Sequence, residues 1–401
     1  MSRFGSAAYR VDERIPGVDL PLLSVSQTLG VIRRSELTDK PARAETLDVY
    51  KVCRKGDIVF NKMSIRAGAM GVAQEDGLVT YHYEVIRLRP GYDARYLAYL
   101  MKSDYFTSEM IKRERGIGSG DQTGVRTTEV PFRILRTIDA YLPDHESQGA
   151  IADFLDRETA KIDALIAKQQ ALIGGLSARK SHLIEAGVGV GKGRLGVKLK
   201  YALSRIDQGI SPDTSTGTDD ARFWVLKAGC SNNGVFVESE SKPVPGQVTV
   251  PSAITVREGD LITSRASGSP MLVGSTAMVG ALHRRLILSD KTFRLVPSPA
   301  VAPRYLYWSL NSPSYRVQVR NAISGADGLA NNLPLSALRR ILIRLPSWEE
   351  QVEIAAFLDL RCGDLDGLTG KVRQAVELAL ERRSAVITAA VTGQLNIGKA
   401  A

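Results

Sequence analysis

Two stretches of this chain are copies of one another. The first reads QGAIADFLDRETAKIDALI at positions 148–166, and the second reads QVEIAAFLDLRCGDLDGLT at positions 351–369. They align without a gap at a constant offset of 203 residues, from position 148 to position 351. A chain that builds the same long segment twice, about half its own length apart, is constrained to a duplicated architecture.

Apolar residues in both copies recur at alternating steps of four and three residues. This heptad spacing is typical of a coiled-coil helix and not of a strand. We therefore expect two long helices whose apolar seams cover each other; two unrelated amphipathic helices, each docked on its own domain, are the alternative. The spacing predicts as helix–helix seam residues Ile151, Leu155, Ile162, Leu165, Leu172, Leu176, Ile354, Leu358, Leu365, Leu368 and Val372.

The order of the segments sets the direction of the helices. Each helix would be roughly 60 Å long at about 1.5 Å per residue, which exceeds what one domain can cover. Because the order is segment, helix, segment, helix, the second helix must run back, so the pair should be antiparallel and pseudo-two-fold symmetric. Gly363, Gly367 and Gly370 each cost about 1 kcal/mol in a helix interior, so we expect irregularity in the second helix.

The repeat extends into the segments outside the helices. RKGDIV at 54–59 returns as REGDLI at 257–262, and PDHESQ at 143–148 matches PSWEEQ at 346–351. Short β-rich runs surround a clear helical stretch in each segment, which predicts an α+β class of fold. The predicted organisation is a first domain at 1–147, a first spacer helix at 148–190, a second domain at 191–347, and a second spacer helix with the C-terminal tail at 348–401.

The composition bounds the partners and the compartment. A net charge of +10, from 53 basic and 43 acidic residues, favours a polyanion as partner because phosphate contacts release bound counterions. The three cysteines are far apart and form no CxxC motif, so we expect no metal site and no disulfide framework. No apolar run approaches the roughly 18 residues of a membrane helix, and the N-terminus lacks a secretion signal. The expectations are a cytoplasmic protein and no membrane partner.

The sequence offers little that resembles a catalytic site. GVGVGKGR at 187–194 imitates a phosphate loop, but Ala186 stands where the first glycine belongs and Gly193 follows Lys192. A flexible linker explains it better. Asp213, Glu240 and Lys242 imitate the residues of a metal-dependent nuclease, although both stretches look like loops. We expect no catalytic residue and no metal, and we keep a self-sufficient nuclease as an alternative.

Taken together, the motifs resemble those of the DNA specificity (S) subunits of type I restriction–modification systems. The residues that carry this resemblance are Gly-Asp-Ile at 56–58, Gly-Asp-Leu at 259–261, the two Pro-x-x-Glu-x-Gln stretches, Phe-Leu-Asp at 154–156 and 357–359, and Ala-Val-Thr-Gly-Gln at 390–394. The resemblance covers nearly the whole chain. It implies two target-recognition domains, each reading one half of a split sequence in double-stranded DNA, with the paired helices fixing their separation.

The resemblance also implies partners and cofactors. Two methyltransferase (M) subunits and two restriction/translocase (R) subunits would assemble on the chain, which itself would be non-catalytic. S-adenosylmethionine, ATP and Mg²⁺ would then act on those partner subunits, with adenine as the methylated base, and no cofactor is expected in this chain. A specificity subunit of a related system, in which one partner fuses cleavage with methylation, is an alternative, as is a structural coiled-coil scaffold without DNA affinity.

Candidates for DNA contact come from polar, glycine-rich loops. Arg, Lys, Gln and Asn are the side chains that pair with the edges of guanine or adenine. For each candidate, a phosphate contact or a solvated surface position is as good an interpretation as base readout. The predicted DNA-binding residues are Lys62, Arg66, Gln122 and Arg126 in the first domain, and Arg265, Ser267, Asn331 and Asn332 in the second.

Overall fold

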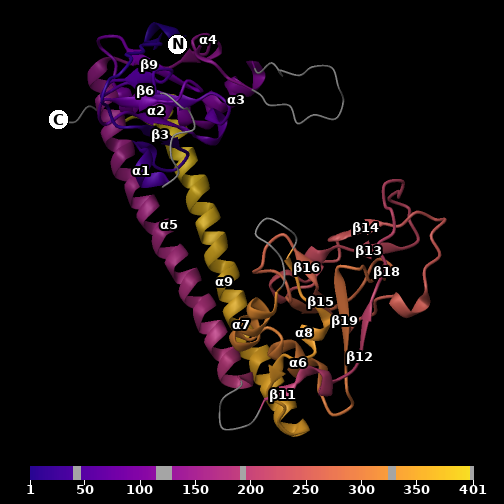
Figure 1. The fold of residues 1–401 in the computed structure, drawn as a ribbon. Coiled ribbons are helices and arrows are strands. Elements are labelled where there is room, and N and C mark those ends of the chain that lie inside the picture. Colours follow the sequence, from indigo (N-terminus) through magenta and orange to yellow (C-terminus); the bar gives the residue numbers. More distant parts are fainter. Residues whose placement is uncertain (39–46, 114–128, 190–195, 324–330, 398–401) are drawn as a thin grey trace. The chain divides into compact units, whose positions relative to one another are not determined.

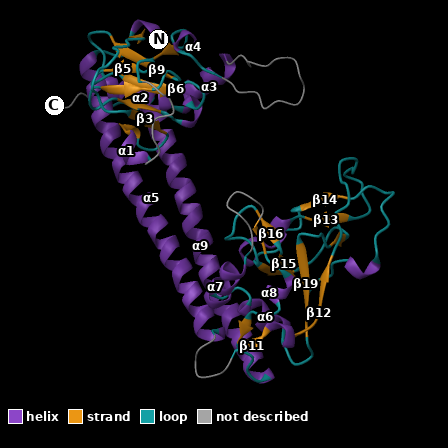
Figure 2. Cartoon of the chain, viewed as in Figure 1, coloured by secondary structure: helices purple, strands orange, loops and turns teal. Residues whose placement is uncertain are grey.

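The chain forms two compact units in the computed structural model, which describes residues 1–38, 47–113, 129–189, 196–323 and 331–397. Unit 1 comprises Met1–Gln170 with Gln374–Ala401, and unit 2 comprises Ala171–Arg373. Each unit contains part of both long helices, α5 (His145–Val188) and α9 (Trp348–Val391). Helices and short strands are mixed in both units (Figure 1, Figure 2), and the α+β class is confirmed.

Unit 1 is built around a four-stranded antiparallel sheet in the order β2-β9-β6-β7. Its core combines this sheet with apolar residues of α2, α3 and α4 and of the two long helices. The elements of unit 1 besides α5 and α9 are β1 (Ser2–Arg3), η1 (Phe4–Ser6), β2 (Ala8–Val11), β3 (Leu23–Ser26), β4 (Gly30–Arg33), α1 (Arg34–Leu37), β5 (Lys51–Cys53), β6 (Ile58–Asn61), η2 (Ile65–Ala67), β7 (Met70–Val72), β8 (Gly77–Val79), β9 (Tyr83–Leu88), α2 (Ala94–Lys102), α3 (Asp104–Arg113), α4 (Phe132–Leu135) and β10 (Asp139–Ala140).

Unit 2 repeats this plan with the four-stranded antiparallel sheet β12-β19-β15-β17. Its elements besides α5 and α9 are β11 (Val197–Lys198), η3 (Leu199–Tyr201), β12 (Leu203–Gln208), β13 (Trp224–Leu226), η4 (Ala228–Gly234), β14 (Ser241–Pro243), η5 (Ser252–Ile254), β15 (Leu261–Ser264), β16 (Ala266–Ser267), β17 (Thr276–Met278), β18 (Leu286–Ile287), β19 (Thr292–Pro297), α6 (Pro303–Ser309), α7 (Pro313–Ala322), β20 (Asn331–Asn332), α8 (Leu335–Leu338) and β21 (Leu342–Ile343).

The two units share a four-stranded sheet and differ in the strands that the chain inserts between the strands of that sheet. In unit 1 the inserted strands form two antiparallel pairs, β3-β4 and β5-β8. In unit 2 the inserted strands β13, β14 and β18 form one mixed sheet in the order β14-β13-β18, in which β13 and β18 are parallel. The duplication therefore preserves the scaffold while the inserted surface differs.

Each unit has a buried tyrosine near the start of a helix, in α2 of unit 1 and in α6 of unit 2, and its hydroxyl bonds to a distant backbone carbonyl. Tyr96 is fully buried, and its hydroxyl donates a hydrogen bond to the carbonyl of Tyr141 at 2.5 Å. In unit 2 the hydroxyl of the buried Tyr305 donates to the carbonyl of Arg344 at 2.8 Å. Asp93 caps the first of these helices by accepting hydrogen bonds from two backbone N–H groups of its first turn.

Within each unit, the segments of α5 and α9 run in opposite directions. In unit 1, Ile162 and Ile166 of α5 cluster with Ala379 of α9, while earlier residues of α5 share a core with later residues of α9. In unit 2, Ile184 and Val188 of α5 share a core with Ala355, Leu358 and Cys362 of α9. Residues later in α5 thus pack against residues earlier in α9, so the two helix segments are antiparallel within each unit.

Three residues of the predicted seam are exposed, and at one of them the neighbouring residue is buried instead. Leu165, Leu172 and Leu368 were expected in the seam, yet their side chains are 49%, 45% and 45% exposed. Ile166, next to Leu165, is buried instead. Neighbouring apolar pairs such as Leu165-Ile166 fit both orders of the four-and-three step, so only the packing decides between them.

The other predicted seam residues face the interior to different degrees. Leu155 and Leu358 are fully buried, and Ile354 and Leu365 are partly exposed. The remaining four are buried: Ile151, Ile162, Leu176 and Val372.

The glycines of the second long helix do not interrupt it. We expected irregularity at Gly363, Gly367 and Gly370, but α9 is one helix of 44 residues. A Cβ added at any of the three would meet no atom within 4 Å apart from the adjacent backbone of α9, so these glycines occupy open positions on the helix surface. Packing on the other face outweighs their low helix propensity. Among the described helices, none combines the length and apolar character that a membrane crossing requires.

Candidate nucleic-acid interface

A buried glutamine joins the globular part of each unit to its long helix. In unit 1, Gln148 accepts a hydrogen bond from the N–H of Asp93 at 3.0 Å and donates one to the carbonyl of Pro143 at 2.7 Å. In unit 2, Gln351 accepts from the N–H of Ala302 at 2.8 Å and donates to the proline carbonyl five residues earlier at 3.0 Å. The glutamine of the Pro-x-x-Glu-x-Gln repeat is therefore a structural joint.

The aspartate of each Phe-Leu-Asp stretch strengthens the same joint. Asp156 on α5 accepts hydrogen bonds from the guanidinium of Arg95 at 2.9 Å and from the hydroxyl of Tyr99 at 2.7 Å. Burial raises the pKa of Tyr99 to about 12, so this hydroxyl keeps its proton near neutral pH. In unit 2, Asp359 accepts hydrogen bonds from the guanidinium of Arg304 and from the indole N–H of Trp308, each at 2.7 Å.

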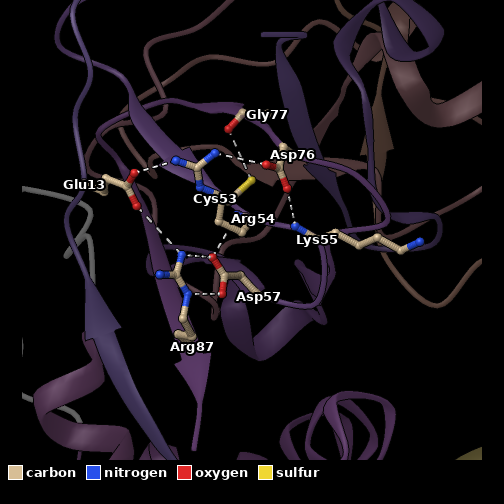
Figure 3. A network of polar contacts seen from close by, with 8 residues as sticks. All are labelled: Glu13, Cys53, Arg54, Lys55, Asp57, Asp76, Gly77 and Arg87. Carbon is tan, nitrogen blue, oxygen red and sulfur yellow. Dashed lines mark hydrogen bonds and ion pairs between the residues drawn. The ribbon is translucent and has the colours of Figure 1, made fainter. Parts of the chain in front are cut away.

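The Gly-Asp repeat forms a turn in unit 1 whose aspartate is hydrogen-bonded to an arginine of the central sheet (Figure 3). We call this arrangement the clamp. Asp57 accepts from the N–H of Arg54 at 2.8 Å and from two nitrogens of the Arg87 guanidinium at 2.8 and 2.9 Å. Hydrogen bonding to Asp57 raises the pKa of Arg87 above its ordinary value. Gly56 has a φ of 91°, a left-handed conformation that favours glycine.

Unit 2 contains the same clamp with different neighbours. Asp260 accepts from the N–H of Arg257 at 2.9 Å and from the guanidinium of Arg294 at 3.2 Å, while Gly259 has a φ of 85°. Arg294 also bonds to Asp207 at 2.6 Å. The Gly-Asp motif is thus explained by folding in both units.

One predicted DNA-binding residue of unit 1, Lys62, contacts the short segment that precedes α4. The N–H of Val130 donates to the carbonyl of Lys62 at 2.9 Å, and the Lys62 ammonium lies 3.1 Å from a carboxylate oxygen of Glu129. Arg66 is exposed in η2. Two further predicted residues lie outside the described residues, Gln122 and Arg126.

The predicted residues of unit 2 come together although they are more than sixty positions apart. Strand β16 pairs with β20, which places Ser267 opposite Asn331 and Ala266 opposite Asn332. The amide of Asn331 donates to the carbonyl of Gly268 at 3.3 Å. Two loops that the sequence treats separately therefore form one edge.

Arg265 points into its own domain. Its guanidinium donates to the carbonyl of Asp290 at 3.2 Å and lies 5.7 Å from the centre of the Phe293 ring. The N–H of Leu333 donates to the Arg265 carbonyl at 2.9 Å, which repeats the contact between Val130 and Lys62. The position is thus equivalent to that of Lys62, but its side chain supports the fold.

The residues considered for a metal-dependent nuclease have separate roles. Asp213 accepts from the N–H of Ser215 at 2.9 Å, Glu240 lies 3.9 Å from Lys227, and Lys242 pairs with Val225 in the sheet β14-β13. Within the described ranges, no group of three His, Cys, Asp or Glu residues is arranged to hold a metal ion. Residues 190–195 of the glycine-rich stretch lie outside those ranges.

Sequence reasoning did not single out a group of arginines on the inserted sheet of unit 2. Arg222, Arg284 and Arg285 are exposed and surround Trp224 at a hollow of about 680 Å³. Arg222 and Arg284 lie about sixty positions apart in the chain, so no local pattern links them. The available signal in the sequence is a pair of short runs that contain arginines beside aromatic rings, Arg-Phe-Trp at 222–224 and His-Arg-Arg at 283–285.

Comparison with known proteins gives consistent results. No family model matches the chain. The StySPI specificity subunit of a type I restriction enzyme from Salmonella potsdam is 29% identical over 175 residues, which are 43% of this chain and 36% of that protein. The chain is similar to type I specificity subunits. The predicted resemblance is therefore confirmed.

Two further comparisons extend this similarity to specificity subunits. The EcoKI specificity subunit of Escherichia coli strain K12 is 25% identical over 144 residues, 35% of this chain and 30% of that protein. The matches thus span about a third of the length of these curated relatives. A chain in a structure concerned with complex assembly of the type I R-M system superposes with a TM-score of 0.70, at 17% identity, over 98% of this chain and 97% of that chain. This last likeness shows a shared fold.

Proposed function

We propose that this chain is the DNA specificity subunit of a type I restriction–modification complex. In this role it reads a bipartite target in double-stranded DNA and carries out no chemistry itself. The observation that carries the proposal is the repeated pair of units: the same glutamine and aspartate joints recur, while the inserted surfaces differ. Identical joints with different surfaces suit a protein that presents two different DNA halves to one machinery.

The proposed ruler is the antiparallel pair formed by α5 and α9 along their whole lengths. Two target-recognition domains, at 1–147 and 191–347, would lie at opposite ends of this pair and be related by a pseudo-two-fold axis. The opposed direction of the helix segments in each unit supports this proposal. A spacer of constant length turns the second half-site contact into an intramolecular step and sets the half-site spacing.

The partners in this proposal are two methyltransferase subunits and two restriction/translocase subunits. S-adenosylmethionine, ATP and Mg²⁺ would be held by those partners. Support comes from the relatives, which are named as specificity subunits of type I restriction enzymes. A subunit that only reads DNA would leave methylation and cleavage to them.

The proposed base-reading segments are the chain around Lys62 in unit 1 and the β16-β20 edge in unit 2. Both lie where a returning segment bonds to an equivalent backbone carbonyl, of Lys62 and of Arg265. Ser267 and Asn331 then lie opposite each other on a short, partly exposed strand pair. Amide and hydroxyl groups of this kind can pair with base edges in a groove.

The deciding experiment is to express the chain with its cognate methyltransferase and to map methylated adenines by single-molecule sequencing. The proposal predicts methylation at one bipartite motif. Exchanging residues 200–345 for those of another specificity subunit should change one half of the motif and leave the other half and the spacing unchanged. Methylation without a bipartite motif, or a change in both halves, would contradict the proposal.

Two alternatives are distinguished by simple assays on the purified chain. A self-sufficient nuclease would cut duplex DNA in Mg²⁺ without partners, whereas the proposal predicts neither cutting nor methylation. A scaffold without DNA affinity would leave duplex DNA unshifted at low salt. A salt-dependent shift that becomes tighter when the methyltransferase is added is expected instead.

A further inference from the structure

We propose that Arg222, Arg284 and Arg285 of unit 2 bind phosphates of the DNA backbone at one half-site. These three residues and Trp224 are called the arginine surface below. The inference rests on the proposed function and assigns it a group of contacts that position the DNA rather than read it. The arginine surface lies on β13 and β18 and on the turns that precede them.

The three arginines line one hollow and have no carboxylate partner among the described residues. All three arginines are exposed and line one hollow of about 680 Å³. None of them forms an ion pair with another residue in the part of the chain that the structure describes, although Asp219 also lines the hollow. Like charges held together raise the electrostatic energy of the free protein, and an anion between them lowers it.

Trp224 orients the central cation. The guanidinium carbon of Arg284 lies 3.9 Å from the centre of the Trp224 ring, whereas Arg222 lies over Phe223 at 5.4 Å. Trp224 itself is buried on β13, so the ring is a rigid platform. Stacking leaves the outer edge of a guanidinium free to donate two parallel hydrogen bonds, the geometry that suits a phosphate.

The turn that carries two of the arginines is held by one carboxylate. Glu238 accepts hydrogen bonds from the N–H groups of His283 and Arg284 at 2.9 and 2.7 Å. The N–H of Trp224 donates to the carbonyl of Arg285 at 2.9 Å, which ties this turn to β13. The backbone that carries Arg284 and Arg285 is therefore fixed before any ligand arrives, which lowers the entropy cost of binding.

The position of the arginine surface assigns it to a single half-site. It belongs to the sheet β14-β13-β18, where unit 1 instead carries the strand pairs β3-β4 and β5-β8. The scaffold that the units share does not include it. We therefore expect it to contribute affinity at the half-site of unit 2 and to leave the choice of bases unchanged.

The test measures the salt dependence of DNA binding by the chain in complex with its methyltransferase. The ligand is a duplex carrying the motif found by methylation mapping. The variant replaces all three arginines by glutamine (Arg222→Gln, Arg284→Gln and Arg285→Gln). Loss of three phosphate contacts should reduce the slope of log K against log salt by about 2.7, so that from about 50 to about 200 mM salt the wild type loses about 40-fold more affinity than the variant.

Matched controls separate this effect from a general loss of charge. The control variant removes three cations of unit 2 that already face carboxylates, through Arg205→Gln, Lys227→Gln and Lys291→Gln. Its salt slope should match that of the wild type. A triple lysine variant of the arginine surface keeps the charge and should retain most of the slope, and thermal melting checks that each variant is folded.

The outcomes distinguish the inference from the function on which it rests. A wild-type complex that binds its motif and a scrambled duplex equally contradicts the proposed function. A complex that selects its motif while the glutamine variant keeps the wild-type slope, or changes the methylated motif, contradicts the inference. Titration with inorganic phosphate at constant ionic strength tests whether the arginine surface binds free phosphate rather than DNA. If the glutamine variant loses phosphate binding while its salt slope with DNA is unchanged, the proposal is also overturned.

Discussion

Asp163 and Arg383 form an ion pair with 2.8 Å between a carboxylate oxygen and the guanidinium Nε, although 220 positions separate them in the chain. Its counterpart in unit 2 joins Lys180 to Asp366 at 2.7 Å. Asp366 follows Asp163 by 203 positions, and Arg383 follows Lys180 by the same number. In the first pair the acid lies on α5 and the base on α9, and in the second pair the acid lies on α9 and the base on α5. The two ion pairs therefore involve equivalent positions of the sequence repeat.

Separating the Asp163–Arg383 pair should have a small effect that a double-mutant cycle can measure. Both side chains are partly exposed, at 51% and 32%, so we expect a coupling energy of about 0.2–1 kcal/mol that falls with added salt. Single changes to alanine and the double change would be compared by urea unfolding. A coupling energy of zero at low salt would contradict a paired geometry.

The displaced seam predicts opposite results for two neighbouring residues of similar size. Ile166→Ala should lower the free energy of unfolding by about 2–4 kcal/mol, because a buried aliphatic side chain leaves a cavity. Leu165→Ala should cost less than about 1 kcal/mol, because that side chain is 49% exposed. Urea unfolding of both variants decides. Equal losses, or a larger loss for Leu165, would restore the seam predicted from the heptads.

The buried glutamine joint predicts a loss of coupling between a globular part and its helix. Gln148→Ala leaves the N–H of Asp93 and the carbonyl of Pro143 without their partner, at a cost of about 1–3 kcal/mol. Gln170→Ala, at an exposed position on the same helix, is the control and should be close to neutral. Hydrogen exchange at the start of α2 should speed up in the first variant only. Protection that stays at the wild-type level would show that the joint contributes little.

The three buried cysteines should resist thiol reagents in the native state. Burial raises the pKa of Cys53 and of Cys230 to about 12, and also raises that of Cys362. The folded thiols keep their protons while unfolded ones ionise near their ordinary pKa of 9.0, so stability should fall as pH rises from about 9 towards 12. A disulfide reagent at about pH 8 should label the chain only after urea is added. Rapid labelling of the native chain would contradict the burial.

Lengthening the two long helices together should change the target spacing. Seven residues added to α5 after Gln170 and seven to α9 before Gln374 preserve the heptad register and extend each helix by about 10 Å. At about 3.4 Å per base pair, the methylated motif should gain roughly three base pairs between its halves. Mapping methylated adenines measures this. An unchanged spacing, or altered half-sites, would contradict the ruler.

The residues of the repeated motifs form structural contacts within their own unit. Gln148, Asp57 and Asp156 lie in motifs that the sequence analysis could use only for resemblance. Their contacts are with backbone and with side chains of the same unit. Their partners are distant in the chain, and Gln148 lies 55 positions from Asp93. No periodicity within one segment reveals a contact of that range.

The sequence by itself determined the duplication, the α+β class and the similarity to type I specificity subunits, because heptads and repeated motifs are local and survive in the order of residues. Tertiary structure alone decided which of Leu165 and Ile166 enters the seam, since both are apolar and only the facing helix distinguishes them. It also turned Arg265 towards Asp290 and brought Arg222 to Arg284, because pairing between distant strands places side chains that no spacing along the chain can relate.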